Sequence, residues 1–177
     1  FVGDGPHEKA TDKLDWGGVF KAFRLADFKA AVSGYFGHMW ELYAFWTLTP
    51  LILVSLLNSS SLDTNSLGQG DESFSAYVSL WAFLLIGIGG LGCILGGYLS
   101  RRWGSARVAF FSLAVSASCC ALYPFLVGVV SSYLLLVLLL LWGLTVVSDS
   151  PQFSALASHH SPAASTGSAL AVMNGIG

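Results

Sequence analysis

The sequence predicts an all-α integral membrane protein, a polytopic helical bundle with about five transmembrane helices. Hydrophobic residues make up 54% of the 177 positions and charged residues only 10%, whereas soluble domains carry roughly 25% charged residues. The apolar residues also form long blocks, and about 20 apolar residues in a row are needed to cross the hydrocarbon core of a bilayer. A water-facing fold could not cover this much apolar surface.

Polar and turn-forming stretches divide the apolar blocks and give the expected domain organisation. Residues 1–29 are predicted to be a cytoplasmic linker, and residues 30–177 a transmembrane domain. The expected spans lie at about 30–57, 74–100, 108–126 and 131–155, with the start of a fifth from 168.

The basic residues predict which loops face the cytoplasm, because Lys and Arg mark the cytoplasmic side of short loops. Five of the eight Lys and Arg residues lie in 1–29 and the other three in the turn at 101–107. The polar loop at 58–73 contains acids but no Lys or Arg. We therefore expect 1–29 and 101–107 on the cytoplasmic side and 58–73 on the outer side.

An acidic residue lies deep in the first apolar block. Glu41 follows His38 by three residues, so the two side chains project from neighbouring positions of one helix face. An ionisable group at this depth is costly to insert, and such residues often mark a pathway. We expect His38 and Glu41 to bind or relay a proton; a structural hydrogen bond to another helix is the equally weighted alternative.

Aromatic residues crowd the same block, among them Trp40 and Tyr43. They are candidates for lining an organic-solute cavity by stacking and hydrogen bonding, although packing or lipid contact is the commoner role of such a cluster. Pro50, further along, lacks a backbone donor, so a kink or local unwinding is expected there.

Two other features interrupt the apolar pattern. Asp149 and Gln152 flank Pro151 in the fourth block, where a substrate-site role and a helix-end role are both open. In the second block, Gly89, Cys93 and Gly97 recur every four residues, a spacing that lets helix backbones approach closely.

The sequence gives no indication of a cofactor, a metal site or an enzyme. Its three cysteines have neither metal-cluster nor disulfide-framework spacing and are interpreted as packing residues. Phosphate-loop, zinc-protease and serine-hydrolase motifs are absent from the sequence. No basic run predicts a nucleic-acid partner, so we expect the lipid bilayer and a small-molecule substrate as partners.

The turn between the second and third blocks carries a family resemblance. Residues 97–107, GYLSRRWGSAR, resemble the cytoplasmic loop motif of the major facilitator superfamily, roughly G-x-L-x-D-R-x-G-R. Gly97, Leu99, Arg102 and Gly104 match in register. Arg101 stands where the family usually has an acid, so the resemblance does not imply the family's acid-based gating contact for this sequence. The candidate gating-loop residues are Gly97, Arg101, Arg102, Gly104 and Arg107.

The order of the blocks also resembles the C-terminal six-helix half of this family. Residues 162–167, which lead into the fifth block, are similar to its P-x-x-x-R-G loop, with Thr166 in the Arg position. The resemblance implies a secondary transporter that works by alternating access about a midplane site, often coupled to protons. By that analogy His38, Glu41 and Tyr43 line one cavity.

The resemblance also implies what else belongs to the protein. Both ends of the sequence look cut, so we expect an N-terminal half of the same chain that supplies the rest of the cavity. The similar sequences are bacterial, so we also expect a multi-pass protein of a bacterial inner membrane. The alternative is a non-transporting membrane protein, such as an enzyme subunit or a solute sensor, built from the same helices.

Overall fold

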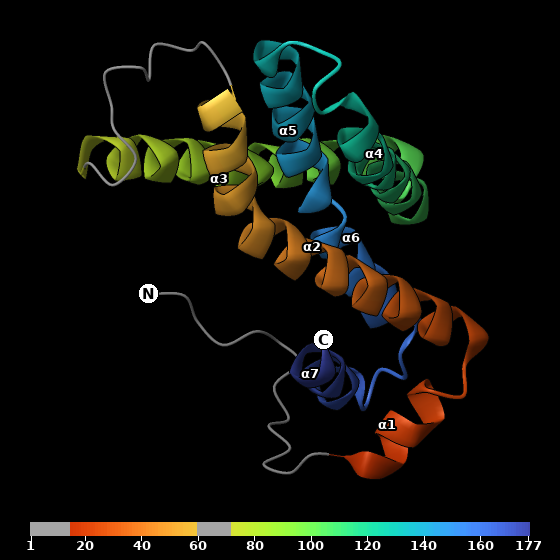
Figure 1. The fold of residues 1–177 in the computed structure, drawn as a ribbon. Helices are drawn as coiled ribbons and strands as arrows, with labels where there is room; N and C mark the ends of the chain where they lie inside the picture. The colour runs from red at the N-terminus through yellow and green to blue at the C-terminus, as the bar shows by residue number, and fades with distance from the viewer. Residues whose placement is uncertain (1–14, 60–71) are drawn as a thin grey trace, which may run out of the picture.

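The computed structural model describes residues 15–59 and 72–177, and every regular element in these two ranges is an α-helix (Figure 1). Part of the predicted linker at 1–29 and most of the polar loop at 58–73 lie outside the described residues. In chain order the helices are α1 (Trp16–Ala22), α2 (Ala26–Ser59), α3 (Glu72–Trp103), α4 (Ser105–Leu126), α5 (Ser132–Val146), α6 (Ser150–His160) and α7 (Thr166–Ile176).

Four segments of the described chain are long and apolar enough to cross a membrane. Three of them correspond to α2, α3 and α4, while the fourth, Ser132–His160, joins α5 and α6 across a break. The outer surface of the bundle is apolar as well. Its exposed side chains include Phe83, Ile94, Phe110, Phe125 and Tyr133. An apolar surface of this kind suits a lipid environment, and the protein is an all-α polytopic membrane bundle, as the sequence predicts.

The first span is longer than a bilayer core requires. Helix α2 has 34 residues, or about 50 Å at the α-helical rise, against a core of about 30 Å. It remains helical through Pro50, so the local unwinding considered from the sequence does not occur, and the ribbon instead changes direction in its second half (Figure 1). The Thr49 hydroxyl next to this proline donates to the Phe45 carbonyl at 2.6 Å.

Helices α3 and α5 meet backbone to backbone. A Cβ added to Gly92 of α3 would overlap the Leu144 carbonyl of α5, and one added to Gly143 of α5 would overlap the Leu85 carbonyl of α3. Gly89, one of the small residues expected to permit close packing, lies on this face as well, since a Cβ there would be 3.1 Å from the Gly143 carbonyl. Gly97, in contrast, has no neighbour where a Cβ would lie.

The short helix α1 packs against the start of α7. The Asp15 amide donates to the Ser168 hydroxyl at 3.0 Å, and a Cβ on Gly18 would collide with the Ser165 side chain. An even number of membrane crossings separates the two segments, so both belong on one side of the membrane, as this contact requires.

Two hydrophobic cores lie along the bundle. One joins α2, α3, α4 and α5 around Phe45, Leu85, Leu139 and Trp142. The other joins α1, α2, α4, α6 and α7 around Phe28, Phe153, Ala169 and Met173. Helix α2 contributes to both cores, and the polar residues of its middle lie where they meet.

Candidate functional site

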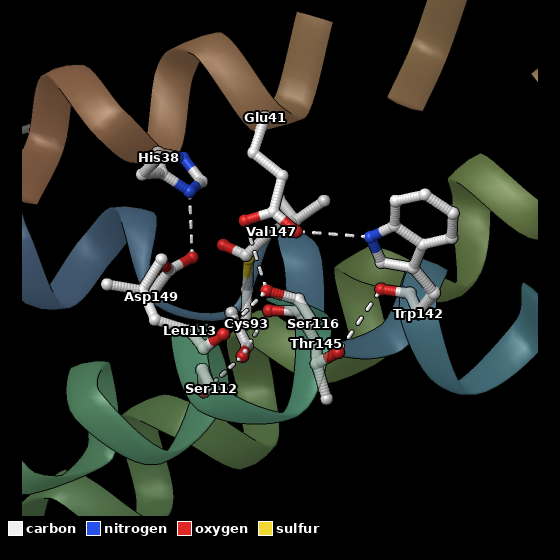
Figure 2. A network of polar contacts seen from close by, with 11 residues as sticks. His38, Glu41, Cys93, Ser112, Leu113, Ser116, Trp142, Thr145, Val147 and Asp149 are labelled. Carbon is white, nitrogen blue, oxygen red and sulfur yellow. Dashed lines mark hydrogen bonds and ion pairs between the residues drawn. The ribbon is translucent and has the colours of Figure 1, made fainter. Parts of the chain in front are cut away.

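A buried polar cluster lies in the middle of the bundle, between the two cores (Figure 2). His38 and Glu41 extend from α2 toward the break between α5 and α6 and toward α4. The residues that form the cluster with them are Cys93 of α3, Ser112 and Ser116 of α4, Trp142 and Thr145 of α5, and Val147, Ser148 and Asp149 of the break.

His38 contacts Asp149. Its Nδ1 lies 2.9 Å from Oδ1 of Asp149, and the two side chains are 0% and 1% exposed. This is ion-pair distance, but the groups are not aligned as a hydrogen bond, so all four polar atoms of the pair are buried without a hydrogen bond among the described residues. Buried polar groups nearly always have such partners, so a pair left in this state requires a physical explanation.

Two aromatic rings lie near the imidazole. The ring centroids of Tyr35 and Phe153 are 6.3 and 6.2 Å from that of His38. In these surroundings the electrostatic interaction between imidazole and carboxylate is stronger than it would be in water.

Glu41 has different partners. Its Oε2 accepts a hydrogen bond from the Ser116 hydroxyl at 3.1 Å, and its Oε1 accepts one from the Trp142 indole N–H at 3.2 Å. Glu41 thus connects α2 to α4 and α5. The sequence placed His38 and Glu41 on one face as a pair, yet each turns toward a different helix, because the nearest polar groups are on different neighbours.

The break in the fourth span connects to two further helices. Cys93 of α3 lies 3.4 Å from the Val147 carbonyl, and the Ser148 hydroxyl donates to the Ser112 hydroxyl of α4 at 2.7 Å. With the His38 contact of Asp149, the three residues of the break, 147–149, interact with three different helices. The break interrupts the regular helical hydrogen bonds, and shorter turn bonds replace some of them, such as that from the Ser150 amide to the Val147 carbonyl at 3.2 Å.

The candidate residues of α2 divide between two faces. His38 is buried and Glu41 half-buried, whereas Trp40 and Tyr43 are 82% and 51% exposed. The exposed face borders an apolar groove of about 680 Å³. Its other lining residues are Phe36, Ala44, Thr47, Leu48, Ile176 and Gly177. Trp40 and Tyr43 therefore line this groove, whereas His38 and Glu41 are not among its lining residues.

Gln152 and the loop motif complete the sequence candidates. Gln152 is buried on α6, one turn after Asp149 and facing Gly96 of α3. Gly104 has a φ of +84°, which favours glycine, and it separates α3 from α4. The three arginines of the loop, Arg101, Arg102 and Arg107, are exposed, and none forms an ion pair with a described residue.

Sequence reasoning missed several members of the cluster. Ser112 and Ser116 are four residues apart in an apolar helix, so a polar stripe at helical spacing was a usable signal. Trp142 lies in a leucine-rich run and gave none. Within residues 15–59 and 72–177, no three His, Cys, Asp or Glu residues come together in a way that could hold a metal ion.

These features define a multi-pass integral membrane protein with ionisable side chains in its interior. Residues 3–177 match the model of the Major Facilitator Superfamily. The chain belongs to this family, whose members are membrane transporters, and this favours a transporter over the enzyme subunit or sensor considered from the sequence. No curated protein and no solved structure matches the chain.

Proposed function

We propose that the protein is a proton-coupled secondary transporter of a small organic solute in a bacterial inner membrane, and that it works by alternating access. His38, Asp149 and Glu41 exchange the proton, and the aromatic face of α2 contacts the solute. An N-terminal half of the same chain, which the family layout implies, completes the cavity.

The charge balance of the cluster is the observation that carries the proton role. The cluster contains two carboxylates, Glu41 and Asp149, but one imidazole, that of His38. Every Lys and Arg among the described residues is exposed and lies near a helix end. If both acids are ionised, the cluster has a net negative charge even when His38 is protonated. Charge inside a bilayer is costly, and a bound proton removes it.

Helix α2 supplies the link between proton and solute. Its buried face bears His38 and Glu41, and its exposed face bears Trp40 and Tyr43. A proton bound at the buried face changes the contacts of α2 with the break at Asp149 and with α4 and α5. Any resulting movement of α2 also moves the aromatic groove, and this couples the two events.

The remaining sequence candidates receive supporting roles. Gln152 lies beside the break and is available to the proton site or to a polar group of the solute. The loop at Gly97, Arg101, Arg102, Gly104 and Arg107 limits the cytoplasmic movement of α3 and α4. Because Arg101 replaces the usual acid, we propose that this limit comes from the tight turn at Gly104 and not from an ion pair.

Transport by the complete chain in proteoliposomes tests the proposal. A pH-sensitive dye inside the vesicles reports proton movement when a panel of organic solutes is added outside. We expect a subset of the solutes to move protons, and we expect Glu41→Gln and Asp149→Asn to abolish that movement. Glu72→Gln and Asp27→Asn are the matched controls, because these acids are exposed at helix starts.

One result would exclude the coupled mechanism. This is solute uptake that persists unchanged when a protonophore collapses the pH gradient, in the original protein and in both cluster variants. Loss of all binding in folded Glu41→Gln would instead assign Glu41 to the solute.

A further inference from the structure

Helix α1 has an exposed aromatic face, and exposed basic residues lie beside it on α1 and in the turn that follows. Trp16 and Phe20 are four residues apart, so they share a helix face, and they are 58% and 65% exposed. Lys21 and Arg24, which follow Phe20, are also exposed. Large exposed aromatic side chains next to Lys and Arg are typical of segments at a membrane interface, where rings enter the acyl boundary and cations meet phosphates.

The opposite face of α1 is already occupied. Gly18, Val19 and Ala22 are buried, and Gly18 lies directly against Ser165 at the start of α7. Asp15 caps the helix by accepting from the Gly18 amide at 3.0 Å. These contacts fix the rotation of α1, so the outward direction of Trp16 and Phe20 is set by packing.

The position of α1 along the chain points to the bilayer surface. Only residues 23–25 separate it from α2, the first membrane-spanning helix. The turn between α3 and α4 lies two crossings further on, hence on the same side of the membrane, and it presents the same chemistry: Trp103 is 54% exposed beside the exposed Arg101 and Arg102.

We propose that α1 is an interfacial helix that docks on anionic phospholipid headgroups of the leaflet from which α2 enters the membrane. Trp16 and Phe20 insert at the acyl boundary, and Lys21 and Arg24 bind lipid phosphates. The contact with α7 then holds the fifth span at a fixed height relative to the lipid surface. This role does not depend on whether the protein is proton-coupled.

Spin labels on the complete chain in lipid nanodiscs test this. In a background of Cys93→Ala, Cys119→Ala and Cys120→Ala, a nitroxide is placed by Phe20→Cys and, as the control on the same helix, by Lys21→Cys. The nanodiscs contain phosphatidylcholine alone or phosphatidylcholine with phosphatidylglycerol. Accessibility to oxygen and to a water-soluble nickel complex reports depth.

In the anionic nanodiscs we expect the ratio of oxygen to nickel accessibility to be several-fold higher at Phe20→Cys than at Lys21→Cys. Adding Lys21→Gln and Arg24→Gln to the Phe20→Cys protein should lower its ratio in phosphatidylglycerol but not in phosphatidylcholine.

Three results would each overturn the proposal. High and equal nickel accessibility at Phe20→Cys and Lys21→Cys would show that the aromatic face of α1 lies in water. Exclusion of both reagents from Phe20→Cys would mean that protein covers it. If the accessibility ratio at Phe20→Cys changed neither with phosphatidylglycerol nor with the loss of the two charges, anionic lipid would not be the partner of α1.

Discussion

Nδ1 of His38 lies 2.9 Å from Oδ1 of Asp149, and both side chains are shielded from solvent. The contact joins the middle of α2 to the break between α5 and α6. It thereby ties the longest helix in the described part of the chain to the point where the fourth span is interrupted.

His38→Gln should destabilise the fold more than Asp149→Asn near neutral pH. The first change leaves a buried carboxylate without a partner, whereas the second leaves a neutral amide beside the imidazole. Breaking a buried pair so that a charge remains costs about 3 kcal/mol. The measurement is thermal unfolding of the purified proteins in detergent at several pH values.

Combining the two changes tests whether the two side chains interact. The double variant His38→Gln with Asp149→Asn should recover most of the loss. Additive losses at every pH would show that the two side chains do not interact.

Ser116→Ala should remove the hydrogen bond by which α4 contacts Glu41. The hydroxyl donates to a carboxylate, and a hydrogen bond of this kind contributes about 1.5 kcal/mol. In a double-mutant cycle of Ser116→Ala with Glu41→Ala, which removes the acceptor, unfolding free energies should give a coupling of that order. Ser118→Ala is the control on the same helix, because Ser118 is exposed and donates only to the Ala114 carbonyl. A coupling near zero would separate Glu41 from α4.

Gly92→Ala should disrupt the contact between α3 and α5. The added methyl group overlaps the Leu144 carbonyl, and backbone cannot move aside as a flexible side chain can. Forcing extra volume into such a contact costs about 1–3 kcal/mol. Gly90→Ala, two residues away on the same helix, has open space at its Cβ. It should be neutral or slightly stabilising, since alanine favours helix. Equal melting temperatures for the two variants would contradict the close approach.

Trp40→Ala should reduce solute affinity without reducing stability. The side chain is 82% exposed and borders the apolar groove, so its removal leaves no cavity in either core. Loss of one aromatic contact should weaken binding roughly twofold to tenfold. The half-saturating concentration of a solute that moves protons in proteoliposomes measures this, with Trp103→Ala as the exposed tryptophan control. Unchanged saturation would remove the groove from the solute path.

The sequence predicted the helical membrane fold and located the polar centre of the first span, because a carboxylate in an apolar block is conspicuous. It also singled out Asp149 and Gln152. The pairings could not be predicted. His38 and Glu41 are one turn apart, and local spacing favours an interaction between them. Their actual partners lie on α4, α5 and the break, and which of these helices faces which turn of α2 is decided by tertiary packing.

The sequence also could not predict that α2 has a polar face and a separate aromatic face. The block is apolar on nearly every side, so its periodicity could not show which residues point inward. Trp40 and Tyr43 looked like neighbours of Glu41 along the chain. Only the placement of α4, α5 and α6 shows that they point away from it.

The glycine contact between α3 and α5 restricts how this bundle can deform. Where backbone touches backbone, no layer of side chains exists that could change rotamers and let one helix slide along the other. A shift by one residue would bring Leu91 or Cys93 of α3 into the place of Gly92. In the transporter that we propose, α3 and α5 would therefore translate as one body, and a change in the side that is open would use contacts in which side chains separate the helices, such as those of α2.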